Sequence, residues 1–477
     1  MIRAALIGLV AAVALSGCAA VGPDYHLPKG AVANAPAAQA PFAEAGRNAG
    51  QIAATGGTSG DPLPPRWWHL YDDPVLDTLE EQALAANTDL RIAAANLARA
   101  RAASSVAEAA KEPEFTVDAL AEHARLSGES YLLSNPLPVM NLGEGMGGVS
   151  YQIDLFGQIR RSVEAARADE AASEATVSTV KVTLAAEVAR AYLTQCAAGE
   201  ALDIGEKAIA VDTRALGITR RLKEAGRAAT SDVTRAEARL AQVEAMVPAQ
   251  RARSRAALYR LAFLMGKAPA DYPREAERCT TIPVIARALP VGDGAGLIAR
   301  RPDVHVAERQ LAAATARIGV ATAALYPHIG IGLSGGSFGL LKDLGTAPAN
   351  TWSIGGLIHW TIPGGGERAR VRAANAEADA ALARFDATVL GALRETETAL
   401  ATYAEDHNRA VSLGVARAAM EREAAETRSL RDAGRSPLLA SIGAAQGTLV
   451  ARAAESSARE AIALDQVNLF LALGGGW

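Results

Sequence analysis

The chain has little surplus charge and few aromatic side chains. Its 477 residues include 48 Lys and Arg against 52 Asp and Glu, a net charge of −4. A nucleic-acid-binding protein would need a clustered basic face, so this balance argues against a nucleic-acid partner. Aromatic residues make up 4% of the chain, whereas 50% is hydrophobic and alanine dominates. Stretches rich in Ala, Glu and Arg favour long helices.

Residues that carry chemistry are also scarce. The seven histidines are scattered and include no HExxH motif or other ligand pair. Apart from Cys18, the only cysteines are Cys196 and Cys279, which have no CxxC spacing and so indicate neither a metal site nor redox chemistry. These two cysteines could pair in an oxidising compartment, but we expect them to be unpaired.

Three short matches to catalytic motifs fail on their context. GxGxxG at Gly330–Gly335 is not followed by a helix, and GxSxG places Ser334 within a strand rather than at a strand-to-helix turn. SxxK at Ser178–Lys181 lies in the middle of a helical stretch. We therefore expect no enzyme activity and no cofactor. A lipoprotein hydrolase and a purely structural scaffold remain the competing functional classes.

The N-terminus is typical of a lipoprotein. Arg3, the apolar run Ala4–Ala14 and the lipobox LSGC predict a signal peptide over residues 1–17, cleaved before Cys18. Cys18 would carry covalent lipid, and the following Ala19 resembles lipoproteins sorted to the outer membrane. Residues 18–60 form the lipidated N-terminal segment, in which the Ala-, Gly- and Pro-rich part 29–60 is expected to be an irregular tether. No later apolar run is long enough for a transmembrane helix.

The rest of the chain is a tandem duplication. The stretch from Asp89 matches the stretch from Asp303, an offset of 303 − 89 = 214 residues. The AGR at Ala225 matches the AGR at Ala433, an offset of 433 − 225 = 208 residues. We therefore expect two repeats, 61–266 and 302–477, joined by an irregular connector over 267–301.

Each repeat predicts two β-strands with one apolar and one polar face. The clearest is the stretch Thr351–Gly366, in which large apolar residues recur at alternate positions. The strands are about ten residues long, the length that a tilted strand needs to cross a bilayer. Their apolar faces would then contact lipid, and their polar faces, which include His328 and His359, would line a water-filled lumen. A soluble sandwich is the alternative.

Four such strands cannot close into a barrel, and an open sheet edge is not tolerated in lipid. Other copies of the chain must therefore complete the barrel. Trp352 and Trp360 lie near opposite ends of one strand, and Tyr151 lies on the apolar face of another. Aromatic residues in these places are typical of a membrane belt.

The long helices have recognisable ends. A helix capped by Asp73 is expected to run to about Lys111. No proline interrupts Gln158–Glu224 or Glu367–Asp432, and the first of these would be a rod of ~100 Å. Glycine ends each rod, at Gly226 and Gly434, and a shorter helix then returns. Thr230 or Ser231 is expected to cap the first returning helix; Ser436 is expected to cap the second, with Pro437 at its first position.

Several motifs resemble the outer-membrane efflux protein family typified by TolC and OprM, in its NodT-type lipoprotein branch. They are CAAVGPDYHLP from Cys18, WWHLYDDPVLDTLEEQALAANTDLRIAAANLARARA from Trp67, YQIDLFGQIRR from Tyr151, RRPDVHVAERQLAAATARIGVATAALYP from Arg300, and the final LALGGGW. The resemblance implies a mainly α-helical homotrimer with a transmembrane portion, in which a twelve-strand β-barrel continues into a twelve-helix periplasmic tunnel. It also implies a passive exit duct in the bacterial outer membrane.

The resemblance implies partners as well: a periplasmic adaptor (membrane fusion protein) and an inner-membrane pump, for which a proton-driven type is the expectation. The helical turns would form the periplasmic tip, where adaptor hairpins dock beside Gly226, Ala228, Gly434 and Ser436. The family's acidic gate positions in the second turn are here Ala440 and Gly443. The remaining gate candidates are Asp232, Asp432, Arg227 and Arg435. The alternative is that these four are solvated helix-end charges worth under ~1 kcal/mol each. The residues do not identify the cargo.

Overall fold

The computed structural model describes residues 20–45, 57–129, 132, 134–285 and 287–475. The expected signal peptide and the lipid-attachment residue Cys18 lie outside the described residues. The chain forms two compact units. The first comprises Met1–Pro28, Asn96–Glu174 and Val306–Phe385, and the second comprises Lys29–Ala95, Ala175–His305 and Asp386–Trp477.

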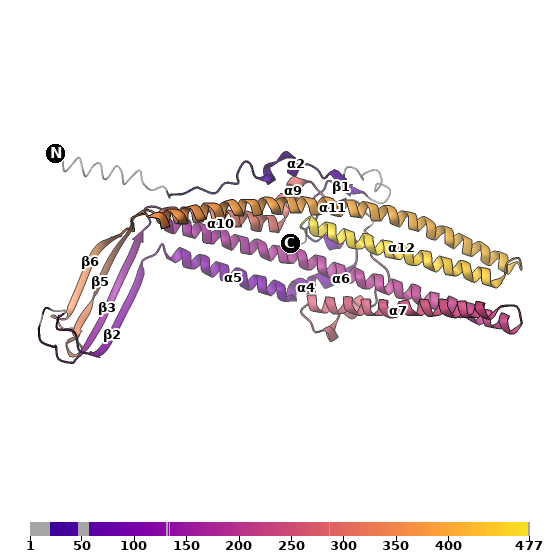
Figure 1. The fold of residues 1–477 in the computed structure, drawn as a ribbon, viewed down its shortest axis with the longest axis horizontal. Coiled ribbons are helices and arrows are strands. Elements are labelled where there is room, and N and C mark those ends of the chain that lie inside the picture. Colours follow the sequence, from indigo (N-terminus) through magenta and orange to yellow (C-terminus); the bar gives the residue numbers. More distant parts are fainter. Residues whose placement is uncertain (1–19, 46–56, 130–131, 133, 286, 476–477) are drawn as a thin grey trace. The chain divides into compact units, whose positions relative to one another are not determined.

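The first unit contains a four-stranded antiparallel sheet in the order β2-β3-β5-β6 (Figure 1). Its strands are β2 (Glu114–Ala124), β3 (Met140–Ile153), β5 (His328–Leu340) and β6 (Asn350–His359). Strand β3, with 14 residues, is longer than the ten or so that we expected, and it begins at Met140. The strand expected within Thr351–Gly366 ends at His359, so Trp360 and Ile362 lie beyond it.

The register of the sheet confirms the predicted alternation of faces. Phe115, Val149, Leu333 and Ile354 oppose one another in one apolar row across all strands. One residue further along β2, the row of Thr116, Gly148, Ser334 and Ser353 lies on the opposite, polar face. The hydroxyls of Ser334 and Ser353 are 2.8 Å apart and share a hydrogen bond across β5 and β6.

Four helices have at least part of their length in the first unit: α5 (Thr88–Ala109), α6 (Gln158–Glu224), α10 (Pro302–Ala323) and α11 (Gly365–Asp432). Arg167 of α6 pairs with Glu108 of α5, and Arg317 of α10 pairs with Asp169 of α6. The 67-residue α6 has the predicted bounds, because neither proline nor a left-handed glycine occurs between Gly157 and Gly226.

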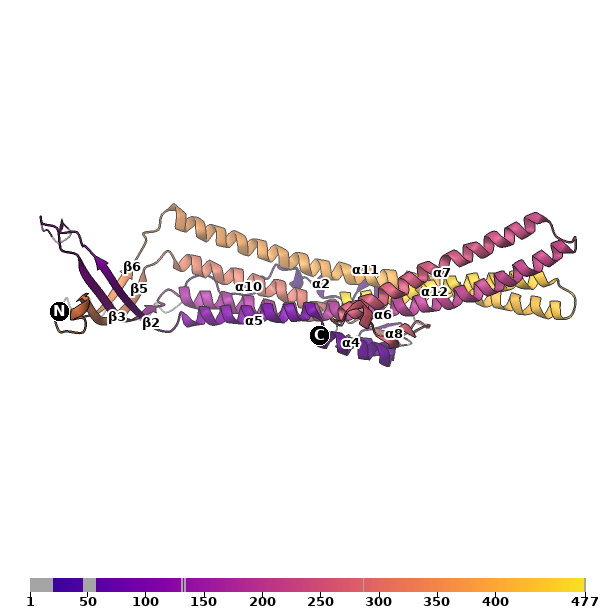
Figure 2. The same cartoon turned by 90° about the horizontal axis from the view of Figure 1, so that it is seen from below.

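The second unit holds the rest of α6 and α11 together with α4 (Pro74–Ala86), α7 (Thr230–Leu264) and α12 (Leu438–Ala472). Helix α7 runs beside α6, and α12 runs beside α11 (Figures 1 and 2). Arg220–Glu237 and Arg452–Glu421 are ion pairs between the members of these two helix pairs. The two repeats therefore build the same helical hairpin.

We expected a single helix from Asp73 to Lys111, but this was wrong, because the helix is interrupted at Asn87. Asp73 does cap α4, accepting hydrogen bonds from the backbone N–H groups of Val75 and Leu76. Asn87 is buried; its amide donates to the carbonyl of Leu264 (2.8 Å), and its Oδ1 accepts from the N–H of Leu90 (3.0 Å). The same side chain thus anchors α7 and begins α5.

The core near α4 is aromatic. The 3-10 helix η3 (Trp67–Tyr71) buries both of its tryptophans. The rings of Trp67 and Phe470 lie 4.8 Å apart, and the Tyr71 hydroxyl donates to the carbonyl of Ala463 (3.2 Å). These contacts fasten η3 to α12.

The tether over 29–60 is more ordered in its described residues than we expected. It contains η1 (Val32–Asn34), α2 (Pro36–Gln39) and β1 (Thr58–Ser59). The Val32 N–H donates to Asp386 of α11 (2.8 Å), and Glu397 accepts from the N–H groups of Ala43 (2.8 Å) and Glu44 (3.0 Å). Burial of Phe42 and several alanines adds apolar contact. This segment packs within the second unit.

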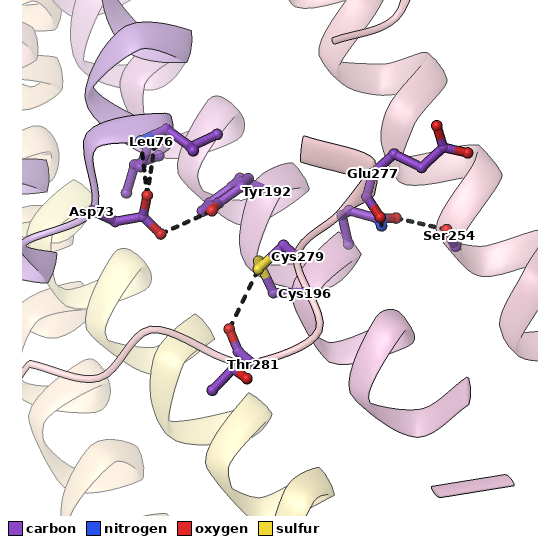
Figure 3. Close-up of a disulfide and its surroundings, with 10 residues drawn as sticks. Asp73, Leu76, Tyr192, Cys196, Ser254, Glu277, Cys279 and Thr281 are labelled. Atoms are coloured by element: carbon purple, nitrogen blue, oxygen red, sulfur yellow. Dashed lines mark hydrogen bonds between the residues drawn. A yellow bond between two sulfur atoms is a disulfide. The ribbon is translucent and has the colours of Figure 1, made fainter. Parts of the chain in front are cut away.

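The connector between the repeats consists of η5 (Pro269–Asp271), α8 (Arg274–Glu277), β4 (Leu289–Pro290) and α9 (Gly294–Arg300). Strand β4 pairs with β1 in parallel. Contrary to our expectation, Cys279 of the connector forms a disulfide with the buried Cys196 of α6 (Figure 3). A Cβ on Gly199 would lie 2.3 Å from the Cys279 carbonyl oxygen, so glycine lets the connector approach α6 closely.

Candidate functional site

The apolar face of the sheet is exposed in the single chain. Val117, Trp352 and Ile354 expose 87%, 74% and 74% of their surface. Soluble monomers rarely expose contiguous apolar patches of this kind. Strands β2 and β6 are the edges of the sheet, each with one side unpaired within the chain. The sheet therefore needs an apolar environment on this face and a further strand at each edge.

The three belt candidates lie on or beside this face. Trp352 is near the start of β6 and is paired with Gly335 of β5. Tyr151 of β3 is paired with Ile331 of β5. Trp360 directly follows β6, and its indole N–H donates to the carbonyl of Leu325 (3.1 Å). The two tryptophans thus mark opposite ends of the strand. Their role in a membrane belt stays a prediction.

The polar face of the sheet is hollowed. Its lining includes Thr116, Ser150, Gln152, His328, Ser334, Ser353 and His359, with glycines between them. The Gln152 amide nitrogen lies 3.4 Å from Nδ1 of His328. His328 and His359 oppose each other across β5 and β6. The sequence placed both on the polar face but did not indicate that they are paired, because the register is set by the loop between the strands.

The two helical turns share one backbone conformation. Gly226 and Gly434 have φ values of 71° and 70°, and the N–H of the next residue, Arg227 or Arg435, donates to a carbonyl five residues earlier. This is a Schellman motif, in which glycine is favoured because a side chain strains the left-handed backbone. The predicted glycine ends are therefore confirmed.

The predicted caps are displaced by one residue or more. Helix α7 has Ala229 as its N-cap rather than Thr230 or Ser231, and Asp232 accepts a hydrogen bond from the Ala229 N–H (3.0 Å). Helix α12 has Pro437 as its N-cap rather than Ser436. Neither cap residue has a side chain that can accept a hydrogen bond, so a carboxylate inside α7 caps instead and α12 begins without a side-chain cap.

The four gate candidates are not joined to one another by ion pairs in the part of the chain that is described. Asp232 pairs with Arg235 (3.2 Å), and Asp432 pairs with Arg431 (2.6 Å). Arg227 and Arg435 are exposed, and neither side chain forms an ion pair with a described residue. Ala440 and Gly443 are exposed as well, as are Gly226, Gly434 and, in part, Ala228 and Ser436. The turns are therefore accessible to a partner.

A groove of about 290 Å³ lies among α6, α7 and α12. Small and apolar residues such as Ala201, Ile204, Val243 and Leu449 line it. Charged residues also line it, including the Arg253–Glu460 ion pair. A partner helix could enter this groove, which lies within the second unit.

Two carboxyl groups meet between α11 and α12. Burial, together with charge repulsion and a side-chain hydrogen bond from the neighbouring Asp406, raises the pKa of Asp465 to about 7. Arg409 forms an ion pair with Asp406 (3.7 Å). At neutral pH Asp465 therefore holds its proton for part of the time.

This pair predicts that stability falls as pH rises. At pH values below 3.8, its ordinary pKa, Asp465 is protonated in both the folded and the unfolded chain. The folded state then does not bear the cost of a buried charge. Between about 4 and 7 the unfolded chain loses this proton first, so the folded state loses stability. Asp465→Asn should raise the free energy of unfolding at neutral pH by about 1–2 kcal/mol, after allowance for solvent screening of a half-buried group, and so raise the unfolding midpoint. Thermal unfolding followed by circular dichroism at several pH values measures this, and an equal pH dependence in the variant would contradict it.

No group of three or more His, Cys, Asp or Glu side chains within the described ranges is placed to hold a metal ion. Among the described helices, none combines the length and the apolarity that a membrane crossing requires.

Comparisons with known proteins agree on one family. The model of a family described as "Outer membrane efflux protein" matches residues 79–267 and 296–475, one range in each repeat. Nodulation protein T of Rhizobium leguminosarum bv. trifolii is 30% identical over 388 residues, which cover 81% of this chain and 79% of that protein. The probable efflux pump outer membrane protein TtgC of Pseudomonas putida is 29% identical over 484 residues, covering 98% and 94% of the two chains. The solved structure of the outer-membrane channel OprN has a TM-score of 0.84 and 32% identity, and covers 96% of this chain and 99% of that one.

Proposed function

Because the chain belongs to the outer membrane efflux protein family, we propose that three copies of it form one channel, closed by strands from each copy. The protein is an outer-membrane exit duct of an efflux system, and its relatives are channels rather than enzymes. The family, the fold class, the function and the location predicted from the motifs are thereby confirmed. The trimer, the lipid anchor, the partners and the gate are proposals.

The observation that supports closure between copies is the open sheet. It has four strands, two unpaired edges and an exposed apolar face. In lipid every backbone N–H and C=O must be paired, so each edge requires a strand from another copy. Three copies would supply 3 × 4 = 12 strands, and the hollowed polar face would then line the lumen.

The mass of the detergent-solubilised protein tests this proposal. We expect about three times the chain mass of 49.2 kDa, less the signal peptides, and an oligomer band that converts to monomer on heating. A protein that remains monomeric in mild detergent would contradict closure between copies.

We propose that lipid on Cys18 anchors the same part of the chain that carries the sheet. The described chain starts two residues after Cys18, and the Val21 N–H donates to the carbonyl of Phe156, just beyond β3 (3.1 Å). The buried Arg161 donates to the carbonyls of Val21 and Gly22 and pairs with Asp24 (2.8 Å). The residues that closely follow Cys18 in the chain are therefore held beside the end of a strand.

We also propose that a periplasmic adaptor docks at the turns around Gly226, Ala228, Gly434 and Ser436, and delivers cargo from an inner-membrane pump, expected to be proton-driven. The exposed turns and the groove among α6, α7 and α12 support this, because a partner helix can bury apolar surface there. Nothing in the described residues selects one cargo.

The gate proposal predicts a larger current when the charge of Asp232 is removed. If Asp232 helps to hold the channel closed, Asp232→Ala raises single-channel conductance or the leak of large antibiotics. Asp232→Asn is the matched control, since it removes the charge but keeps an oxygen that can accept from the Ala229 N–H. An increase in both variants assigns the effect to charge, and an increase in the Ala variant alone assigns it to the turn. No change in either variant would contradict a gating role.

A further inference from the structure

We propose that His328 and His359 form a binding site for a divalent transition-metal cation, of the class of Cu²⁺, Ni²⁺ and Zn²⁺, on the polar face of the sheet. His328 is the first residue of β5 and His359 the last of β6, and the two are directly opposed in the register. Both lie in the hollow that also contains Ser334 and Ser353. This site goes beyond the exit-duct function and does not depend on it.

The spacing of the pair suits chelation. Directly opposed residues on antiparallel strands have Cβ atoms about 4.5–5.5 Å apart. Two imidazoles on such a pair can both reach one ion at the metal–nitrogen distance of about 2.0–2.1 Å. Imidazole nitrogen is a preferred ligand of copper, nickel and zinc, and binding is expected to be strongest for Cu²⁺.

The backbone on either side of the pair is held in place. The indole of Trp360, which follows His359, donates to the carbonyl of Leu325 (3.1 Å). The ring of Tyr326, two residues before His328, stacks on Phe156 at a centroid distance of 4.6 Å. The backbone at both histidines is therefore already fixed, which lowers the entropy cost of bringing the two side chains to one ion.

The surroundings leave room for the other ligands. Gly330 and Gly332 on β5 and Gly355 on β6 line the same hollow, so no side chain crowds the pair from these positions. The amide of Gln152 lies beside His328, with its nitrogen 3.4 Å from Nδ1, and a rotated amide would present its oxygen instead. No group of three or more His, Cys, Asp or Glu side chains lies here among the described residues, so water would fill the positions that the two imidazoles and this amide leave open.

Copper titration of the purified, full-length protein in detergent tests the site, with an affinity tag that contains no histidine. We expect one Cu²⁺ per chain and an electron paramagnetic resonance spectrum of copper with nitrogen ligands. His328→Gln and His359→Gln should each weaken binding by at least ~10-fold. His123→Gln is the matched control, because His123 of β2 lies on the opposite face, beside Asn141 (2.7 Å), and it should bind copper like the wild type.

Equal copper affinity in the wild type and in the double variant His328→Gln/His359→Gln would overturn the proposal. So would an absence of nitrogen ligands in the spectrum. Circular dichroism and the mass in detergent establish that the variants are folded and assembled like the wild type. Conductance of the wild type without metal tests the channel separately, so failure of the metal site is distinguishable from failure of the channel.

Discussion

Ile354→Arg is expected to prevent insertion of the protein into the outer membrane. Ile354 lies on the apolar face of β6 and exposes 74% of its surface in the single chain. Arginine on the lipid face of a membrane strand costs about 2–4 kcal/mol at mid-membrane, and three copies would each carry the cost. Fractionation of cells and the amount of heat-modifiable oligomer in the outer membrane measure the effect.

Ser353→Arg is the matched control. Ser353 is the neighbouring residue and lies on the polar face, where its hydroxyl meets that of Ser334. The same arginine there would enter the lumen, so insertion and assembly should be retained while ion selectivity changes. Equal loss of insertion in both variants would contradict the assignment of the two faces, as would normal insertion of Ile354→Arg.

Loss of the disulfide is expected to have the second-largest effect. Cys196 and Cys279 are 83 residues apart in the sequence, so the bond restricts a long loop in the unfolded chain. Restriction of this kind typically stabilises by about 2–4 kcal/mol. The double variant Cys196→Ser/Cys279→Ser should therefore have a lower unfolding midpoint by circular dichroism, although contacts such as the hydrogen bond from Gln195 to the Glu277 carbonyl remain.

A reducing agent provides the control for this prediction. It should lower the midpoint of the wild type to that of the double variant and leave the variant unchanged. A wild-type midpoint that is insensitive to complete reduction would show that the bond contributes nothing to stability. The comparison is made on midpoints because an assembled membrane protein need not unfold in two states.

Local chemistry made the strands and long helices predictable from sequence. The two faces of the sheet follow from alternation alone, as the rows through Phe115 and Thr116 show. The turns follow from glycine, because Gly226 and Gly434 adopt a left-handed conformation that other residues rarely take. Family motifs added the channel function, which composition and periodicity do not contain.

The features that the sequence did not indicate depend on contacts between distant segments. Asn87 breaks a helix because its side chain binds the Leu264 carbonyl, 177 residues away. The tether is ordered because Asp386 and Glu397 of α11 accept from its backbone. The disulfide and the opposed histidines likewise require knowledge of packing and register. The prediction of the α7 cap was wrong for a local reason, since Asp232 caps the helix from within it.

The most direct test of the exit duct is the single-channel conductance of the purified mature protein in planar lipid bilayers. We expect discrete, ion-selective openings of one size class from the oligomer, because sheets from several copies enclose a polar lumen. An assembled, correctly folded oligomer that never conducts would contradict it, and a periplasmic scaffold would then be the better description.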